Sequence, residues 1–325
     1  MYFNEKKTTY LDEYGLKKHS IKIQTQSFWY RLKELNKIIM MEKPDVVYTW
    51  ANLESVFILL LNPFHGFRFI NGSVRHGIRS KKFSHYFRTL ILHLSPHIVA
   101  NSLAGLKANN LKRGMVLYNG IDSKFLGKLL EEKKILRREL LFPKITKKLL
   151  LVSVANLVPY KDYYSVLIAL SEVIKEEVNF HYIILGDGPL RSPIEKTIKR
   201  YSMEENITLL GNVDNVNEYL QIADLLIHSS KGEGCSNAIL EAMAAGLPII
   251  ASDTGGTSEI VTAENGVLFT YRNINQLKEN IEFLLKNPQK RKLLGENSRR
   301  IIREKFTIQR MMNDYYYIVN EIANS

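Results

Sequence analysis

Short apolar runs alternate with amphipathic stretches through the second half of the chain, and this alternation constrains the fold more than any other feature. The runs are rich in Val, Ile and Leu and fall at residues 149–154, 181–185, 207–210, 225–228, 248–251 and 267–269. The stretches between them carry apolar residues at helical spacing. Buried strands that alternate with helices form parallel βαβ units, whose sheet is covered by helices on both faces. We therefore predict an α/β, doubly wound, Rossmann-like domain.

The first half repeats this alternation less regularly. Expected strands fall at residues 21–23, 45–48, 67–70, 98–100 and 115–118, and expected helices at residues 28–41, 52–61 and 102–109, with one more around Leu90. Residues 71–76 are polar and predict a loop, whereas residues 122–148 predict a Lys/Glu-rich helical linker and residues 274–324 two or three consecutive helices. We predict two Rossmann-like domains, residues 1–140 and 141–325, that face a cleft.

Composition excludes several classes of protein. The 325 residues are 45% hydrophobic and 24% charged, as in globular proteins with a large core. No apolar run approaches the about eighteen residues of a membrane span, and the N-terminal residues MYFNEKKTTY carry charges where a signal peptide needs an apolar segment. Cys235 is the single cysteine, which excludes an internal disulfide, and no zinc-type spacing of Cys and His occurs. We therefore expect a cytoplasmic protein.

Positive charge is concentrated in the first half of the chain. Up to Leu140 there are 24 Lys and Arg against 11 Asp and Glu, and the remainder has 21 against 22. A basic half attracts an anion, which could be a nucleic acid, a phosphorylated substrate or an anionic membrane surface. Nucleic acid is disfavoured, because no recognisable aromatic motif interleaves the basic residues. A solvated Lys-rich surface without a specific partner is the plainer alternative.

Two glutamates stand out in the stretch HSSKGEGCSNAILEAMAAGLPIIASDTGGTSE, residues 228–259. Glu233 lies in a glycine-broken loop, and Glu241, with seven residues between the two, lies in a helix that begins near Asn237. The N-terminus of such a helix binds anions such as a diphosphate, and Gly234 lets the backbone approach closely. Glu241 would then reach a ribose and Glu233 a sugar on the other side of the phosphates. Alternatively, Ser236 only caps the helix and Glu241 is solvated.

The same stretch resembles the signature of a large enzyme family. Glu233-Gly234, the segment Asn237-Ala-Ile-Leu-Glu241 and the later Gly255-Gly256 are similar to the motifs of retaining, nucleotide-sugar-dependent glycosyltransferases with the GT-B fold, known as glycosyltransferase family 4 or glycosyl transferases group 1. Further similar motifs follow in order at residues 43–47, 119–122 and 185–189. The resemblance runs from Lys43 onward and is strongest over residues 149–269. It implies C-terminal helices that pack back toward the first domain.

The resemblance also implies roles for single residues. Glu233 would bind the donor sugar, Glu241 the ribose, and Lys161 the diphosphate, whose growing negative charge an ammonium stabilises. No D-x-D sequence occurs, so we expect no metal and no cofactor, and Lys161 with the helix N-terminus at Ser236 and Asn237 would take the metal's place. An ordinary surface lysine is the alternative for Lys161.

The chain departs from the family pattern at two places. The family has Gly-Arg where this chain has Ala155-Asn156, so the uncharged Asn156 leaves a cation missing, which Arg75 or another basic residue of the first domain would supply. The glycine-rich loop of the first βα unit is absent from residues 1–43, so we expect a shortened acceptor-side domain. His76 is a candidate proton acceptor, although the leaving phosphate could take the acceptor proton instead.

Loops after strands supply the remaining candidate residues, because ligands of such sheets bind beyond the carboxyl ends of the strands. Gly186 and Asp187 would meet the base or phosphates, Val213 the nucleobase through its backbone, and Asn119 begins another such loop. These loops are equally compatible with ordinary turns. Cys235 has no adjacent histidine and is interpreted as a small residue that fills the loop.

These observations predict a hexosyltransferase of bacterial-type surface polysaccharide biosynthesis that moves a sugar, with retention, from a nucleoside diphosphate sugar to a saccharide or polyprenyl-diphosphate-linked acceptor. The basic first half suggests transient contact with the anionic inner face of the membrane. Three alternatives remain open: a donor-binding pseudoenzyme, a nucleotide-sugar epimerase and a phosphorylase.

Overall fold

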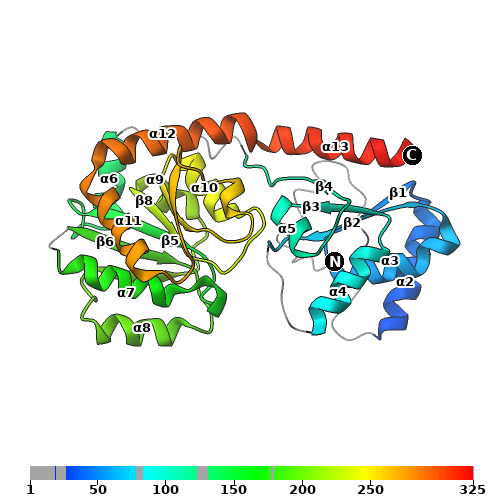
Figure 1. Ribbon diagram of the computed structural model, residues 1–325, viewed down its shortest axis with the longest axis horizontal. Coiled ribbons are helices and arrows are strands. Elements are labelled where there is room, and N and C mark those ends of the chain that lie inside the picture. Colours follow the sequence, from blue (N-terminus) through cyan, green and yellow to red (C-terminus); the bar gives the residue numbers. More distant parts are fainter. Residues whose placement is uncertain (1–18, 20–26, 78–82, 123–130, 177–178, 325) are drawn as a thin grey trace. The chain divides into compact units, whose positions relative to one another are not determined.

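The computed structural model describes His19 and residues 27–77, 83–122, 131–176 and 179–324 (Figure 1). The strand predicted at residues 21–23 lies outside the described residues. The chain divides into two compact units: Met1–Ser73, Lys82–Ile98 and Val319–Ser325 form the first, and Val74–Lys81 and Val99–Ile318 form the second. The predicted domain boundary after residue 140 stays a prediction.

The second unit is built on a six-stranded parallel sheet in the order β10-β9-β8-β5-β6-β7. Its strands are β5 (Leu149–Val154), β6 (Phe180–Leu185), β7 (Ile207–Gly211), β8 (Leu225–His228), β9 (Ile249–Ser252) and β10 (Gly266–Phe269). Each predicted strand is present within one or two residues. The chain passes from β5 outward to β7 and then returns to the other side of β5 at β8, so its direction across the sheet reverses between β5 and β8.

Helices cover both faces of this sheet, as the alternation predicted. One face carries α7 (Tyr163–Ile174), α8 (Arg191–Arg200) and α11 (Ile274–Lys286), and the other carries α9 (Val216–Ile222), α10 (Asn237–Ala245) and α12 (Pro288–Lys305). Successive strand residues point to opposite faces. In β5, Leu150 and Val152 pack under α9 and α10, whereas Leu151 packs under α7.

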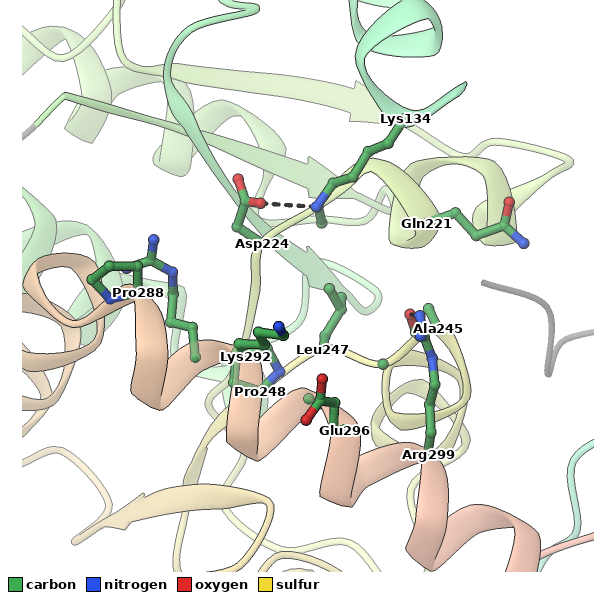
Figure 2. Close-up of a pocket in the computed structure, with 14 residues that line it drawn as sticks. Lys134, Gln221, Asp224, Ala245, Leu247, Pro248, Pro288, Lys292, Glu296 and Arg299 are labelled. Atoms are coloured by element: carbon green, nitrogen blue, oxygen red, sulfur yellow. Dashed lines mark hydrogen bonds and ion pairs between the residues drawn. The ribbon is translucent and has the colours of Figure 1, made fainter. Parts of the chain in front are cut away.

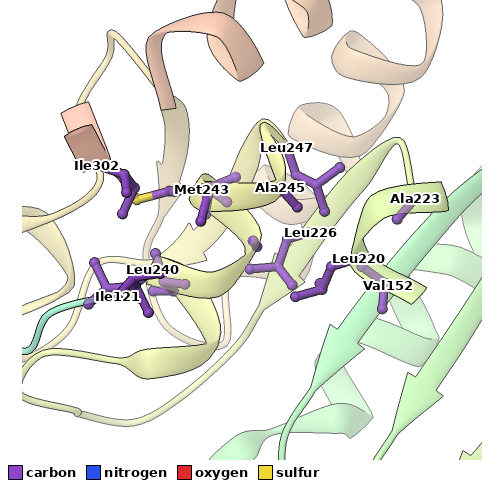
Figure 3. Packing of buried hydrophobic residues seen from close by; sticks show 14 of the residues in the cluster. Ile121, Val152, Leu220, Ala223, Leu226, Leu240, Met243, Ala245, Leu247 and Ile302 are labelled. Carbon is purple, nitrogen blue, oxygen red and sulfur yellow. The ribbon is translucent and has the colours of Figure 1, made fainter. Parts of the chain in front are cut away.

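The core beneath α10 fixes the position of this helix (Figure 3). Leu240 and Met243 of α10 pack with Leu226 of β8 and Ile302 of α12, and all four side chains are buried. Burying a side chain of this size stabilises the fold by about 1.5–3 kcal/mol. The helix that carries Glu241 is therefore rigidly seated.

A second parallel sheet has the order β1-β2-β3-β4. Its strands are β1 (Val46–Thr49), β2 (Arg68–Val74), β3 (His97–Ala100) and β4 (Met115–Val116), and its helices are α2 (Phe28–Glu42), α3 (Asn52–His65), α4 (Phe83–Leu94) and α5 (Leu103–Ala108). Ile39, Ile58 and Phe69 form the core of the first unit.

The structure corrects the loop predicted at residues 71–76, because β2 continues to Val74. The polar residues Asn71 and Ser73 are buried in this strand and satisfy one another, and the Asn71 amide also donates to the Ser95 hydroxyl at 2.9 Å. Polar side chains that bond one another can occupy a buried strand. Polarity alone was therefore a misleading sign of a loop.

The predicted linker contains α6 (Glu131–Leu141), which is anchored to the second unit. Lys134 and Arg138 both form ion pairs with Asp224, at 2.9 and 2.5 Å. Asp224 also accepts a hydrogen bond from the Leu150 amide of β5, at 2.8 Å. At the other end of the chain, α13 (Ile308–Asn324) contributes its last turns, from Val319 on, to the first unit, as expected for the tail. Within the described ranges, no helix is both long and apolar enough to cross a membrane.

Candidate functional site

Lys161 and Glu233 meet at the place where the strand order of the six-stranded sheet reverses. Lys161 ends a short 3-10 helix, Pro159–Lys161, that follows β5, and Glu233 lies in the loop that follows β8. Parallel α/β sheets bind ligands at such a switch point, beyond the carboxyl ends of the two diverging strands. The two loops are tied together by the Lys231 amide, which donates to the Tyr160 carbonyl at 2.7 Å.

The Lys161 ammonium and the Glu233 carboxylate form a largely buried ion pair and hydrogen bond. Burial acts to raise the pKa of Glu233, but protonated His228, the Lys161 charge, and hydrogen bonds from Lys161 and Ser236 together hold this pKa below its usual range. At neutral pH the positive charge that stabilises the ionised Glu233 carboxylate is that of Lys161, because His228 is then neutral. Three predicted residues, Lys161, Glu233 and Ser236, are thus brought into direct contact.

His228 is a member of this cluster that sequence analysis missed. It ends β8, it is fully buried, and its Nε2 lies 3.8 Å from the Glu233 carboxylate. Burial and the nearby Lys161 charge lower the pKa of His228 to about 4. Among the described residues Nε2 has no hydrogen-bond partner. The sequence did contain an indication of this role, since His228 is a polar residue at the end of an otherwise apolar strand, just before the loop.

Glycines hold the Glu233 loop between two other segments. The Glu233 carbonyl accepts a hydrogen bond from the Gly256 amide at 2.8 Å, and the Gly234 amide donates to the Arg75 carbonyl at 3.1 Å. A Cβ on Gly77 would lie 2.5 Å from the Glu233 carbonyl, so only glycine fits there. This packing explains why Gly-Gly at residues 255–256 accompanies Glu233-Gly234 in the sequence.

Arg75 therefore contacts this loop through its backbone carbonyl, and His76 is the next residue along the chain. The Arg75 carbonyl binds Gly234, and both side chains are exposed to solvent. Their predicted roles as cation and proton acceptor stay predictions.

The N-terminus of α10 is positioned by Asn119. The Asn119 side-chain amide donates to the Cys235 carbonyl at 2.9 Å and to Asn237 Oδ1 at 2.7 Å. Ser236 occupies the N-cap position without a side-chain cap hydrogen bond, so its hydroxyl serves Glu233 and not the helix. Burial raises the pKa of the Cys235 thiol to about 12, which keeps it protonated and agrees with its interpretation as a loop-filling residue.

Glu241 lies one turn into α10 and is half-buried. Burial raises the pKa of its carboxyl. No hydrogen bond or ion pair is given for it among the described residues. A half-buried carboxylate that is not neutralised by the protein suits a ligand that offers hydroxyl donors, which is what the predicted ribose would do.

Asn156, Gly186 and Asp187 form a neighbouring cluster of loops. The Leu157 amide donates to the Asp187 carbonyl at 3.0 Å, and a Cβ on Gly186 would collide with the Ala155 carbonyl, so the loop after β6 rests against the loop after β5. The Asn156 side chain is exposed. Asp187 lies 3.5 Å from Arg191, a cation next to Asn156's loop that the sequence did not single out.

Val213 has a structural role that sequence analysis did not assign. Its partly buried side chain packs against the core beneath α10. Only its backbone remains for the predicted contact with a nucleobase.

Glu259 ends the stretch that sequence analysis singled out, residues 228–259, but the sequence alone assigned it no role. Its carboxylate accepts hydrogen bonds from the Leu103 and Ala104 amides at the start of α5, at 2.8 and 2.7 Å, and from the Tyr118 hydroxyl at 2.8 Å. It thereby satisfies amides that a helix start leaves unpaired. Its distance in sequence from α5 concealed this contact.

Metal binding stays untested. Among the residues that the structure describes, no group of three or more His, Cys, Asp or Glu side chains could hold a metal ion. The predicted donor residues are one lysine, two carboxylates and a helix N-terminus.

Comparison with known proteins identifies the family. Residues 134–301, just over half of the chain, match the model of the glycosyl transferases group 1, and the chain belongs to this family. It is 28% identical over 174 residues to N-acetyl-alpha-D-glucosaminyl L-malate synthase of Bacillus anthracis, covering 53% of this chain and 45% of that protein. Poly(ribitol-phosphate) alpha-N-acetylglucosaminyltransferase of Staphylococcus aureus is 29% identical over 178 residues, 54% of this chain and 33% of that protein. The chain spans about half the length of the curated relatives it matches.

Solved structures show the fold. The crystal structure of Anabaena HepE in complex with UDP resembles this chain with a TM-score of 0.81 at 19% identity, covering 89% of this chain and 82% of that chain. The fold is GT-B, as the sequence motifs predicted.

Proposed function

We propose that this chain transfers a hexosyl group from a nucleoside diphosphate sugar to a saccharide or lipid-linked saccharide, with retention of anomeric configuration. The observation that carries the proposal is the Lys161–Glu233 pair at the switch point of the sheet, in contact with Ser236 at the start of α10. A cation and a helix N-terminus together favour a diphosphate, and the carboxylate favours the hydroxyls of a sugar.

Lys161 and the N-terminus of α10 would stabilise the departing nucleoside diphosphate as it gains negative charge. Glu233 stays ionised at neutral pH, because Lys161 keeps its pKa low, and it would accept hydrogen bonds from the donor sugar. A same-face attack then delivers the acceptor proton to the leaving phosphate. This scheme uses neither a metal nor a protein base, and the role of His76 in it would be to orient the acceptor.

The acceptor class is proposed from charge and from relatives. The Staphylococcus aureus relative is named for action on poly(ribitol-phosphate), a polymer that contains phosphate. The 24 basic residues up to Leu140 favour an acceptor that carries phosphate, at the cytoplasmic face of an anionic membrane. We therefore favour a phosphorylated, lipid-linked saccharide of surface polysaccharide synthesis.

A thermal-shift screen with nucleoside diphosphates and their sugars tests donor binding. At least one of them should raise the melting temperature of the wild-type protein, and Glu241→Ala should abolish that shift. The matched control is Glu279→Ala, which removes an exposed helix glutamate of α11 and should leave the shift intact. Glu241→Gln keeps the shape of the side chain, and it should weaken the shift without affecting folding. A shift that survives in Glu241→Ala would contradict the assignment.

A donor-binding pseudoenzyme is the second candidate, and Asn156 favours it. Its exposed, uncharged side chain stands where the resemblance places a diphosphate-binding arginine. Incubation with the donor that gives the thermal shift and a phosphorylated saccharide acceptor separates the candidates, because a transferase yields an extended saccharide. Binding without transfer or hydrolysis would favour the pseudoenzyme, and an interconverted nucleotide sugar would favour an epimerase.

A further inference from the structure

A cavity of about 510 Å³ lies in the second unit, at the end of α10 opposite to the predicted donor site (Figure 2). It is lined by α6, by the end of α9 and the residues that lead into β8, by the end of α10 and the turn into β9, and by α12. The helix α10 has nine residues and is therefore roughly 13 Å long, which is the separation of its two ends. None of the predicted donor-site residues lines this cavity.

The charge of the cavity lining is positive. Lys134, Arg291, Lys292 and Arg299 outnumber Asp224 and Glu296 by four to two. Asp224 is already neutralised by Arg138, which lies outside the lining and pairs with it at 2.5 Å. Lys134 also contacts Asp224, at 2.9 Å. Because two cations share this one carboxylate, one positive charge is left without a negative charge to balance it.

Two of the cations are held in place by the protein. Arg291 Nη1 donates to the Leu285 carbonyl at 2.8 Å, and the Arg299 guanidinium donates to the Ala245 carbonyl at the end of α10. A guanidinium has five N–H donors in a fixed fork, so these bonds orient both groups, and Arg291 retains donors for a ligand. Groups that are already ordered lose little side-chain entropy when they bind an anion.

An amide and a carboxylate complete the lining. Gln221 offers an amide, and Glu296 offers a carboxylate for which no ion pair is given among the described residues. These groups suit hydroxyls, whereas the fork-shaped cations suit phosphate oxygens. The volume falls within the range of about 300–1,000 Å³ typical of small-molecule sites.

We propose that this cavity binds a phosphomonoester of a small polyhydroxylated molecule, of the sugar-phosphate class, with the phosphate on Arg291, Lys292 and Arg299 and the hydroxyls on Gln221 and Glu296. The proposal does not depend on the proposed function, since no donor-site residue takes part. Because α10 reaches both sites, a ligand here is placed to influence the donor site through one rigid helix.

The experiment measures binding to the full chain by calorimetry with glucose 6-phosphate, inorganic phosphate and glucose. Glucose 6-phosphate should bind more tightly than inorganic phosphate, and glucose should not bind measurably. Lys292→Glu reverses an exposed charge of the lining and should weaken glucose 6-phosphate binding at least tenfold. The matched control is Lys305→Glu, an equal charge reversal at an exposed position of the same helix outside the lining.

A second set of variants distinguishes this cavity from the donor site. Glu241→Ala should leave glucose 6-phosphate binding unchanged, and saturating UDP should not displace it. The proposal would be overturned if Glu241→Ala or UDP removed glucose 6-phosphate binding while Lys292→Glu left it intact. That result would place the ligand at the donor site. Equal affinity for inorganic phosphate and glucose 6-phosphate would overturn the sugar-phosphate class, and absence of binding at millimolar concentration would overturn the site.

Discussion

Lys161 and Glu233 stabilise each other's charge, because the two side chains form an ion pair and both are largely buried. Lys161→Met should lower the free energy of unfolding by about 3 kcal/mol, since it leaves the Glu233 carboxylate without its cation. Glu233→Gln removes the stranded charge, so in the Lys161→Met background it should cost less than in the wild type. Urea unfolding of the two single variants and the double variant measures this coupling. Strictly additive losses would show that the pair does not interact.

His228 should make the protein sensitive to acid. Its folded-state pKa of about 4 lies below the 6.5 of an unperturbed histidine. Between these values the unfolded chain binds a proton that the folded chain does not, so stability is full above pH 6.5 and falls as the pH drops toward 4. The slope from this residue is at most about 1.4 kcal/mol per pH unit.

Comparing the pH dependence of urea unfolding in wild type and His228→Gln tests this contribution, since the variant should lose less stability between pH 6.5 and 4. His93→Gln, at an exposed position, is the control and should leave the slope unchanged. The lowered pKa of Glu233 acts in the same direction at the acid end, so some acid sensitivity should remain in His228→Gln. Identical slopes in wild type and His228→Gln would contradict the burial of a neutral imidazole.

The junction between α10 and α12 requires a glycine. Gly246 ends α10 with a φ of 81°, and a Cβ there would collide with the Arg299 guanidinium, which itself bonds the Ala245 carbonyl. Gly246→Ala should therefore destabilise the second unit by about 2–3 kcal/mol, which combines left-handed backbone strain with displacement of Arg299. Thermal or urea unfolding measures the loss.

Gly66 provides the matched control for this junction. It ends α3 with a φ of 69°, and a Cβ there would meet nothing within 4 Å. Gly66→Ala should therefore cost only the backbone strain of about 1 kcal/mol. Equal losses for the two substitutions would show that Arg299 moves aside freely.

The helices and strands that show a clear hydrophobic periodicity were predictable from the sequence. The strands and helices of the second unit matched because buried runs of Val, Ile and Leu leave a local signal that packing did not override. β2 was cut short because Asn71 and Ser73 satisfy each other inside the sheet, a tertiary fact without a local signal. The predicted end of a strand was therefore wrong where polar side chains were buried in the sheet.

The candidate site was predictable only in part, for the same reason. The motifs identified Lys161 and Glu233, and the strand order now explains why they meet. His228 was not identified and Glu259 was given no role, since the contacts of His228 depend on the fold of the loop and those of Glu259 join residues 155 and 156 positions apart. The cavity behind α10 is built from four separate segments, and no single stretch of sequence indicates it.

At the scale of the whole molecule, the uneven charge predicts binding to anionic membranes. The chain has a formal net charge of +12, and all of this excess lies in its first 140 residues. Each Lys or Arg near an anionic surface contributes about 1 kcal/mol, and salt screens this attraction over a Debye length of about 10 Å at 0.1 M. The protein should therefore sediment with vesicles containing anionic phospholipid at low salt, and dissociate from them near 0.5 M salt.

Paired charge reversals show which part of the chain carries this attraction. Lys112→Glu with Arg113→Glu should weaken vesicle binding several-fold, because both residues are exposed and belong to the basic segment. Lys196→Glu with Arg200→Glu makes the same change in net charge on exposed residues of α8, outside that segment, and should have a smaller effect. Equal losses from the two pairs would mean that net charge alone drives adsorption. Sedimentation with neutral vesicles as efficient as with anionic ones would exclude the electrostatic contact altogether.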